Sequence, residues 1–130
     1  MARLLIDVLY HYRRERGLLL HAFTVMPNHL HVLLSIGPEL SIERTAQLIK
    51  GGFSFRASRE LDFRPVVWQR GYSEVRILSA PEFFTREQYI HQNTVRAGLA
   101  QTAEEYPYCS ASAEFVSDAS PFRSAQEAGG

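Results

Sequence analysis

The chain has 130 residues, of which 45% are hydrophobic and 22% are charged, the size and composition of one soluble globular domain. No apolar run approaches the roughly 20 residues that a membrane-spanning helix needs. The single cysteine, Cys109, excludes an internal disulfide framework and favours a reducing compartment. We therefore expect a cytoplasmic protein with no membrane partner.

The formal net charge is zero, but the charges are unevenly distributed. The first 100 residues hold 13 basic and 9 acidic side chains, whereas the last 30 hold one basic and five acidic side chains. All the basic residues except Lys50 are arginine, which binds phosphate through two parallel hydrogen bonds and stacks on bases. This pattern permits a nucleic-acid partner, although a bias in genomic base composition explains the arginines equally well.

Hydrophobic periodicity predicts a helix followed by two strands, over residues 2–16, 18–26 and 29–36. Gly17 would end the helix, and Pro27-Asn28 is a pair that favours the turn between the strands. Further along, the sequence predicts a helix, two short strands and a last helix, over residues 41–61, 66–69, 74–78 and 81–98.

Local residues support these boundaries. Ser41 would cap the second helix, and Pro81 would open the third. Gly51 and Gly52 weaken the second helix by about 1 kcal/mol each, and they permit either a kink or the close approach of a neighbouring backbone or DNA strand. Residues 1–112 are expected to form one domain, followed by a polar, disordered tail over residues 113–130.

The stretch "VMPNHLHVLL" places two histidines in an otherwise apolar strand. Because side chains alternate between the faces of a strand, His29 and His31 should share one face while Leu30 and Val32 share the other. Two neighbouring imidazoles can chelate one metal ion. The alternative is a polar, solvated edge of a half-buried strand.

The third predicted helix carries Tyr89 and, one turn later, Asn93 on the same face. Arg86 and Arg96 lie near that face as well. His91 falls about 200° round the helix from Tyr89, so we expect it to be a packing or surface residue. A tyrosine and an asparagine at this spacing are by themselves a weak functional signal.

The sequence as a whole resembles the single-tyrosine HUH transposases, in particular the IS200-like branch that includes the REP-associated tyrosine transposases. The segments "MPNHLHVLL", "KGGFSFR", "VWQRGY" and "YIHQNTVRAGL" occur here in the order seen in that family. The resemblance extends over about residues 2–112 and includes "YPYCSA". It implies an α+β fold with a ferredoxin-like antiparallel sheet and helices on one face.

The resemblance also implies a site. It makes His29, His31 and Asn93 the ligands of a divalent metal, and Tyr89 the nucleophile that attacks single-stranded DNA. Two imidazoles and one amide suit Mn²⁺ or Zn²⁺ better than Mg²⁺, whereas the family implies Mg²⁺ or Mn²⁺.

Two departures from the family pattern stand out. Thr94 occupies the position where the family usually has proline, which leaves Asn93 unchanged. The family fold begins with a strand, whereas this chain opens inside the first helix, so we expect the first strand to be absent. An unpaired sheet edge invites association with another chain, and we therefore expect a homodimer.

The expected function is metal-dependent cleavage and rejoining of single-stranded DNA through a 5′-phosphotyrosine, as in DNA transposition or the processing of REP elements. One alternative is an inactive remnant that binds hairpin or single-stranded DNA, and another is a metal-dependent hydrolase that uses water. The residues expected to bind the DNA backbone are Arg86, Arg96, Lys50, Arg56 and Arg70. The aromatic residues that either stack on bases or belong to the core are Phe53, Phe55, Trp68 and Tyr72.

Overall fold

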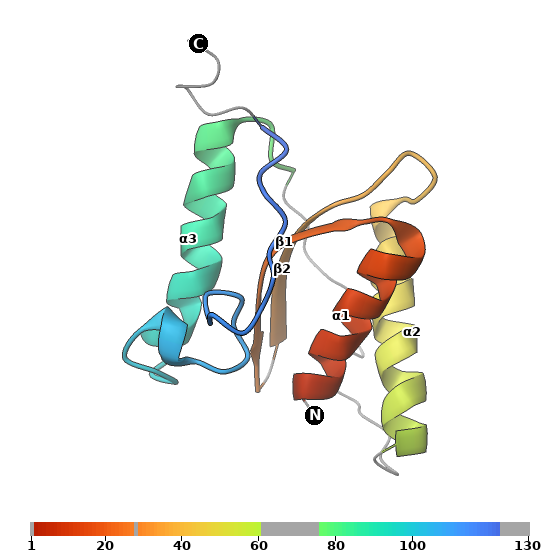
Figure 1. Cartoon of the computed structure of the whole chain (residues 1–130), viewed down its shortest axis with the longest axis horizontal. Coiled ribbons are helices and arrows are strands. Elements are labelled where there is room, and N and C mark those ends of the chain that lie inside the picture. Colours follow the sequence, from red (N-terminus) through yellow and green to blue (C-terminus); the bar gives the residue numbers. More distant parts are fainter. Residues whose placement is uncertain (1, 28, 61–75, 123–130) are drawn as a thin grey trace.

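The computed structural model describes residues 2–27, 29–60 and 76–122. Figure 1 shows two strands forming a middle layer, with two helices packed on one side and a third helix on the other. The elements in chain order are α1 (Ala2–Arg16), β1 (Leu19–Met26), β2 (His29–Ser35), α2 (Ile42–Glu60), α3 (Ala80–Arg96) and the short 3-10 helix η1 (Ala103–Glu105). The fold is of the α+β class, as predicted.

The helix ends follow the capping residues in the sequence. After α1, Gly17 adopts a φ of 67°, a left-handed conformation that glycine tolerates best. The hydroxyl of Ser41 accepts a hydrogen bond from the Arg44 amide at the start of α2. The hydroxyl of Ser79 does the same for the Glu82 amide at the start of α3. These local contacts explain why the predicted and observed helix boundaries agree closely.

The two strands form an antiparallel hairpin in which Thr24 pairs with His31 and Met26 pairs with His29. The register shifts between Leu20 and Ala22, where β1 has an irregularity. Among the described residues the sheet contains these two strands. In this part of the chain, β1 is therefore the one strand that pairs with β2.

One face of the hairpin packs against α1 and α2. Phe23 and Val25 of β1 join a buried cluster with apolar residues of α1 and with Ile49 and Phe53 of α2. Leu30 of β2 packs against the same cluster. This face therefore holds the larger part of the core.

The other face of the hairpin is covered by α3. Ala22 and Leu33 from the strands pack against Phe83 and Ile90 of α3 in a second cluster. The resemblance predicted that the helices lie on one face of the sheet, and in this respect the prediction is wrong. The second face also carries apolar residues, and α3 buries them. The face that α3 covers is the one that includes His31.

The segment after α3 pairs with the edge of β1 that does not face β2. Thr24 forms a bridge with Cys109, and the amide of Ser110 donates to the carbonyl oxygen of Phe23. The Tyr106 hydroxyl donates to the carbonyl oxygen of Val25 at 2.8 Å. The short segment around Cys109 thus lies beside β1 as an additional extended strand would.

Residues 113–122 also belong to the packed structure, which corrects the prediction of a disordered tail from residue 113. The Asp118 carboxylate accepts two hydrogen bonds from the Arg13 side chain and one from the Leu20 amide. The Tyr10 hydroxyl donates to the carbonyl oxygen of Val116. Polar residues in this segment make specific contacts with α1 and β1, which composition alone does not reveal.

Some predictions concern residues outside the described part of the chain. The strand predicted over residues 66–69 lies there, as do Trp68 and Tyr72. Residues 76–78, the described end of the other short strand, have no strand conformation. Within the described residues, no helix is both long enough and apolar enough to cross a membrane.

Candidate functional site

The histidine pair lies on the face of β2 that α3 covers. The ring centroids of His29 and His31 are 4.9 Å apart, and the ring planes are nearly perpendicular, at 88°. Strand alternation puts both side chains on this face, whereas the intervening Leu30 packs into the opposite core. His29 is exposed and His31 is half-buried, so a ligand can reach both rings from solvent.

Tyr89 on α3 lies next to this pair. Its ring centroid is 6.0 Å from that of His31, and the two rings are nearly perpendicular. The tyrosine is 37% exposed. The helix is held here by Phe83 and Ile90, which pack onto the sheet on either side of Tyr89 in the sequence. The structure thus brings together two of the predicted site elements, the histidine strand and the tyrosine helix.

Two arginines flank the Tyr89 ring. The guanidinium carbons of Arg86 and Arg96 each lie 5.2 Å from the ring centroid, within the range of cation–π contact. Neither guanidinium has an ion pair with a carboxylate among the described residues, whereas Arg3, Arg13 and Arg56 do. Arg86 and Arg96 are therefore available to bind an anion beside Tyr89.

Asn93 follows Tyr89 by one turn on the same side of α3. Its side-chain nitrogen is buried and has no hydrogen-bond partner among the described residues. Buried polar atoms are rarely left without partners, so the Asn93 amide is a candidate ligand group. Rotating the Asn93 amide by 180° would present its oxygen in the same place.

The electrostatic environment suits a metal ligand at His31. Burial lowers its pKa below the ordinary value, and the neighbouring His29 and Arg86 lower it further. A neutral imidazole at physiological pH has a free lone pair for a metal. Among the described residues no group of three or more His, Cys, Asp or Glu side chains forms a metal site. Two imidazoles and the Asn93 amide are a chemically suitable donor set for a divalent cation such as Mn²⁺.

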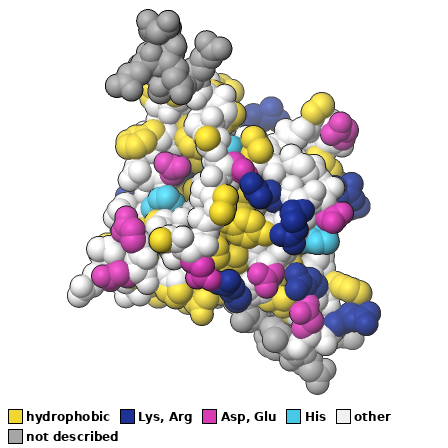
Figure 2. Space-filling view, in the orientation of Figure 1, with side chains coloured by type: hydrophobic (Ala, Val, Ile, Leu, Met, Phe, Trp, Pro, Cys, Tyr) yellow, Lys and Arg dark blue, Asp and Glu magenta, His cyan; other side chains and the backbone are white. Residues whose placement is uncertain are grey.

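The other predicted DNA-binding residues lie on α2 or outside the described residues. Lys50 lines a groove of about 920 Å³ that also contains His29 and His31 and runs along β2. Arg56 forms an ion pair with Glu60 on α2, at 2.7 Å. Arg70 lies outside the described residues. In the view of Figure 2, basic side chains are interspersed with acidic ones and form no continuous basic patch.

The two described aromatic residues that were predicted either to stack on bases or to belong to the core differ in exposure. Phe53 is 4% exposed and belongs to the core, whereas Phe55 is 61% exposed and lies beneath the guanidinium of Arg59. Phe55 remains a candidate for base stacking. Its position on α2 separates it from the helix that carries Tyr89.

The structure also identifies one groove residue that sequence reasoning missed, and it gives His91 the kind of structural role that was expected. Arg76 lines the groove, and its place in the sequence gives no sign of this. His91, expected to be a packing or surface residue, is half-buried with its Nε2 2.9 Å from the Ser110 hydroxyl. It therefore has a structural partner on the segment that lies beside β1.

Comparison with known proteins gives the same family as these observations. The family model described as "Transposase IS200 like" matches residues 1–93, a range that includes His29, His31, Tyr89 and Asn93. A relative from Haemophilus influenzae, named as a REP-associated tyrosine transposase, is 27% identical over 100 residues. That alignment covers 68% of this chain and 56% of the relative, so the chain spans about half the length of that protein. No solved structure matches the chain. Since the family model covers well over half of its residues, the chain belongs to the IS200-like transposase family.

Proposed function

We propose that this chain cleaves and rejoins single-stranded DNA with Tyr89 as the nucleophile. The observation that carries the proposal is the distance of 6.0 Å between the rings of Tyr89 and His31, with two guanidinium groups beside the tyrosine. A nucleophile, a pair of metal-competent imidazoles and two anion-binding groups then share one site. This combination suits the attack of a phenol on a phosphodiester.

The reaction is a transesterification that conserves the phosphodiester bond. The Tyr89 oxygen forms a bond to phosphorus while the bond from phosphorus to the 3′-oxygen breaks. The phenol proton is lost to water, and the leaving 3′-oxygen takes up a proton, so the products are a 5′-phosphotyrosine and a free 3′-hydroxyl. Because no water adds to phosphorus, a 3′-hydroxyl can attack the phosphotyrosine and rejoin the strand.

The protein's own groups have distinct roles in this step. Arg86 and Arg96 hold phosphate oxygens near Tyr89, because their guanidiniums lie beside its ring. His29, His31 and Asn93 would hold Mg²⁺ or Mn²⁺. A bound cation of this kind supplies positive charge to the scissile phosphate and the leaving oxygen.

We further propose that the partner is single-stranded or hairpin DNA and that the chain forms a homodimer. The dimer follows from the edge of β2 that has no partner strand among the described residues, since such edges favour association. Static light scattering measures the mass of the species in solution. A mass of one chain at all concentrations would contradict the dimer.

The experiment that tests the function is a search for a covalent protein–DNA adduct. Hairpin-bearing single-stranded DNA is incubated with Mn²⁺ and the protein, and the products are separated on a denaturing gel. We expect an adduct with the unaltered chain and none with Tyr89→Phe, which keeps the ring and removes the attacking oxygen. Binding without an adduct would identify a DNA-binding remnant, and cleavage by Tyr89→Phe would identify a hydrolase that uses water.

A further inference from the structure

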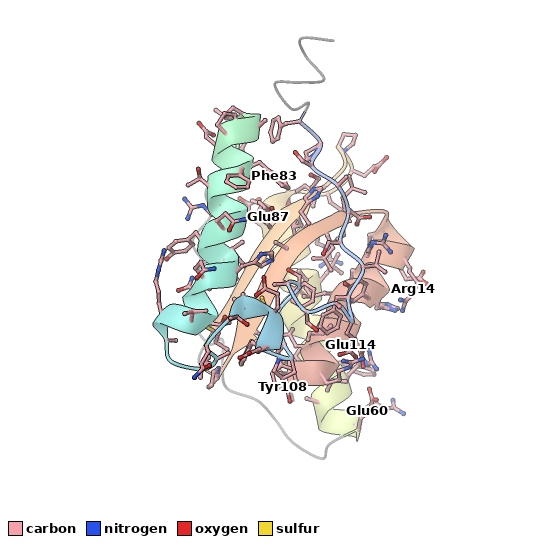
Figure 3. All side chains as sticks on the ribbon, turned by 60° about the vertical axis from the view of Figure 1, so that its left-hand side comes forward. Arg14, Glu60, Phe83, Glu87, Tyr108 and Glu114 are labelled. Carbon is pink, nitrogen blue, oxygen red and sulfur yellow. The ribbon has the colours of Figure 1, made fainter. Side chains whose placement is uncertain are left out.

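The hydroxyl of Ser110 joins the tyrosine helix to the sheet. It accepts a hydrogen bond from the Phe23 amide of β1 at 2.9 Å and lies 3.2 Å from the Phe23 carbonyl oxygen. It also lies 2.9 Å from Nε2 of His91 on α3. Figure 3 shows η1 and the segment that carries Tyr108 lying over the strands, beside the C-terminal part of α3. One buried hydroxyl therefore contacts both the sheet and the helix.

The three contacts of Ser110 assign the direction of each hydrogen bond. A serine hydroxyl has one proton to donate and two lone pairs that accept. The Phe23 carbonyl oxygen is an acceptor, so it receives the serine proton, while the Phe23 amide donates to one lone pair. His91 then donates from Nε2 to the second lone pair. This arrangement satisfies all three contacts at once and uses every hydrogen-bonding position of the hydroxyl.

The bond from His91 to Ser110 differs in kind from the apolar contacts of α3. Phe83 and Ile90 pack against residues of the hairpin, and apolar contact of this type has no preferred direction. A hydrogen bond weakens steeply when its donor and acceptor lose their alignment. The apolar contacts therefore hold α3 on the sheet, and the His91 bond resists rotation of the helix about its own axis.

Rotation of α3 would move Tyr89 as well as His91. The two residues lie about 200° apart round the helix, so they occupy nearly opposite flanks. A turn of about 20° would displace a side chain at the helix radius of about 5–6 Å by about 2 Å. A displacement of about 1 Å at a reacting group can cost on the order of 100-fold in rate. The 6.0 Å separation of the Tyr89 and His31 rings thus depends on a contact made on the far flank of the helix.

We propose that His91 is a positioning residue for the nucleophile: its hydrogen bond to Ser110 fixes the rotation of α3 about its axis and so holds the Tyr89 ring beside His31. The inference rests on the proposed function for the role of Tyr89. It adds a residue that acts through the helix rather than at the reacting phosphate.

Three single substitutions separate positioning from a general effect on stability. His91→Leu removes the donor and leaves Ser110 with both of its bonds to Phe23. His91→Gln restores a donor, because the glutamine amide nitrogen is as many bonds from Cα as Nε2 of histidine. Gln92→Leu, at the next and exposed position of α3, is the matched control. A thermal melt by circular dichroism gives a temperature at which every variant is fully folded.

The rate of adduct formation is measured at that temperature, with Mn²⁺ and saturating hairpin-bearing single-stranded DNA. His91→Leu should lower the rate by about tenfold or more, and His91→Gln should stay within about threefold of the unaltered chain. Gln92→Leu should leave the rate unchanged. DNA affinity, measured by fluorescence anisotropy without metal ion, should change by less than about twofold in all three variants, because the DNA-binding arginines are intact.

A contact that only stabilises the fold would not change the rate of fully folded protein. An unchanged rate in His91→Leu would therefore overturn the proposal, and so would a loss in His91→Gln as large as that in His91→Leu.

Nuclear magnetic resonance of the DNA-free chain tests the geometry without cleavage. The ¹⁵N shifts of the His91 ring should place its proton on Nε2, and a proton on Nδ1 would contradict the assigned bond. We expect a nuclear Overhauser effect between the ring protons of Tyr89 and His31 in the unaltered chain and in His91→Gln. This effect should be lost in His91→Leu. Its persistence there, or its absence from the unaltered chain, would overturn the proposal.

The two measurements separate this inference from the proposed function. A chain that forms no adduct, but loses the contact between the Tyr89 and His31 rings in His91→Leu, would support the inference and contradict cleavage. A chain that forms the adduct at the same rate with and without the His91 imidazole would support cleavage and contradict the inference.

Discussion

The ring of Tyr89 stands nearly perpendicular to that of His31, with 6.0 Å between their centroids, although the two residues belong to different elements. Their proximity depends on the small cluster in which Phe83 and Ile90 of α3 pack against Ala22 and Leu33 of the hairpin. The packing of this second core therefore positions Tyr89 over the histidine strand.

The metal site can be tested directly by calorimetry with Mn²⁺ and hairpin-bearing DNA. We expect about one ion per chain, and His31→Ala should weaken binding by more than tenfold because it removes one of two imidazole ligands. Asn93→Ala should weaken binding less, because a neutral amide oxygen is the poorest ligand of the three. His11→Ala, an exposed histidine on α1, serves as the control. Equal binding by His31→Ala and the control would contradict the site.

The site residues lie within one chain, and this predicts that active sites are not shared between protomers. Each of His31→Ala and Tyr89→Phe should fail to form the adduct, and an equimolar mixture of the two should fail as well. If the tyrosine helix acted on the histidines of a partner, some mixed dimers would contain one complete site. Recovery of adduct in the mixture would therefore rule out the single-chain arrangement.

Two adjacent glycines in α2 should respond oppositely to alanine. A Cβ at Gly51 would meet nothing within 4 Å, so Gly51→Ala should stabilise the helix by about 1 kcal/mol. A Cβ at Gly52 would lie 2.9 Å from the hydroxyl oxygen of Tyr12 and 3.3 Å from a methyl carbon of Val8 on α1. We expect Gly52→Ala to destabilise the protein by about 1 kcal/mol, because α1 or its side chains must move.

Urea unfolding of the two glycine variants measures this difference. Equal stabilisation by both substitutions would mean that α1 and α2 are not in close contact at Gly52. The structure favours the explanation in which this glycine permits a close approach, and the approaching element is a helix of the same chain rather than DNA.

The contact between Asp118 and Arg13 predicts a pH-dependent contribution to stability. The Arg13 hydrogen bonds, with the Leu20 amide, lower the pKa of the Asp118 carboxyl from 3.8 to about 2. The carboxyl is charged in the folded protein at pH values where it is protonated in the unfolded chain. The contribution of the Asp118 carboxylate to the free energy of unfolding is therefore complete above about pH 4 and is lost as the pH falls through 2.

Asp118→Asn should cost up to about 2 kcal/mol of unfolding free energy at pH 6, and the difference from the unaltered protein should vanish near pH 2. Glu114→Gln, which removes an exposed ion pair with Arg3, is the control and should cost less than about 1 kcal/mol. Urea unfolding at a series of pH values gives both curves. A cost of Asp118→Asn that stays constant with pH would contradict the assigned contact.

The sequence was sufficient for the parts of the molecule that local rules determine. Gly17, Ser41 and Pro81 mark helix ends by their own conformational preferences, and the alternation of a strand places His29 and His31 on one face. The spacing of Tyr89 and Asn93 likewise follows from the helical repeat.

Contacts between distant segments could not be predicted in this way. Nothing near Phe83 in the sequence indicates that α3 covers the second face of the hairpin. Asp118 lies in a stretch whose polar composition resembles a flexible tail, yet its carboxylate accepts a hydrogen bond from the Leu20 amide of β1. Such contacts depend on the three-dimensional arrangement of residues far apart in the chain.

The most direct test of the central claim is mass spectrometry of the covalent adduct. Trypsin cleaves after Arg86 and Arg96 and releases residues 87–96, a peptide in which Tyr89 is the single tyrosine. After nuclease digestion of the bound DNA, we predict that this peptide carries a nucleotide attached through its 5′-phosphate to Tyr89, and that the released DNA fragment ends in a 3′-hydroxyl. An unmodified peptide 87–96 together with a nucleotide on another residue would contradict the claim that Tyr89 is the nucleophile.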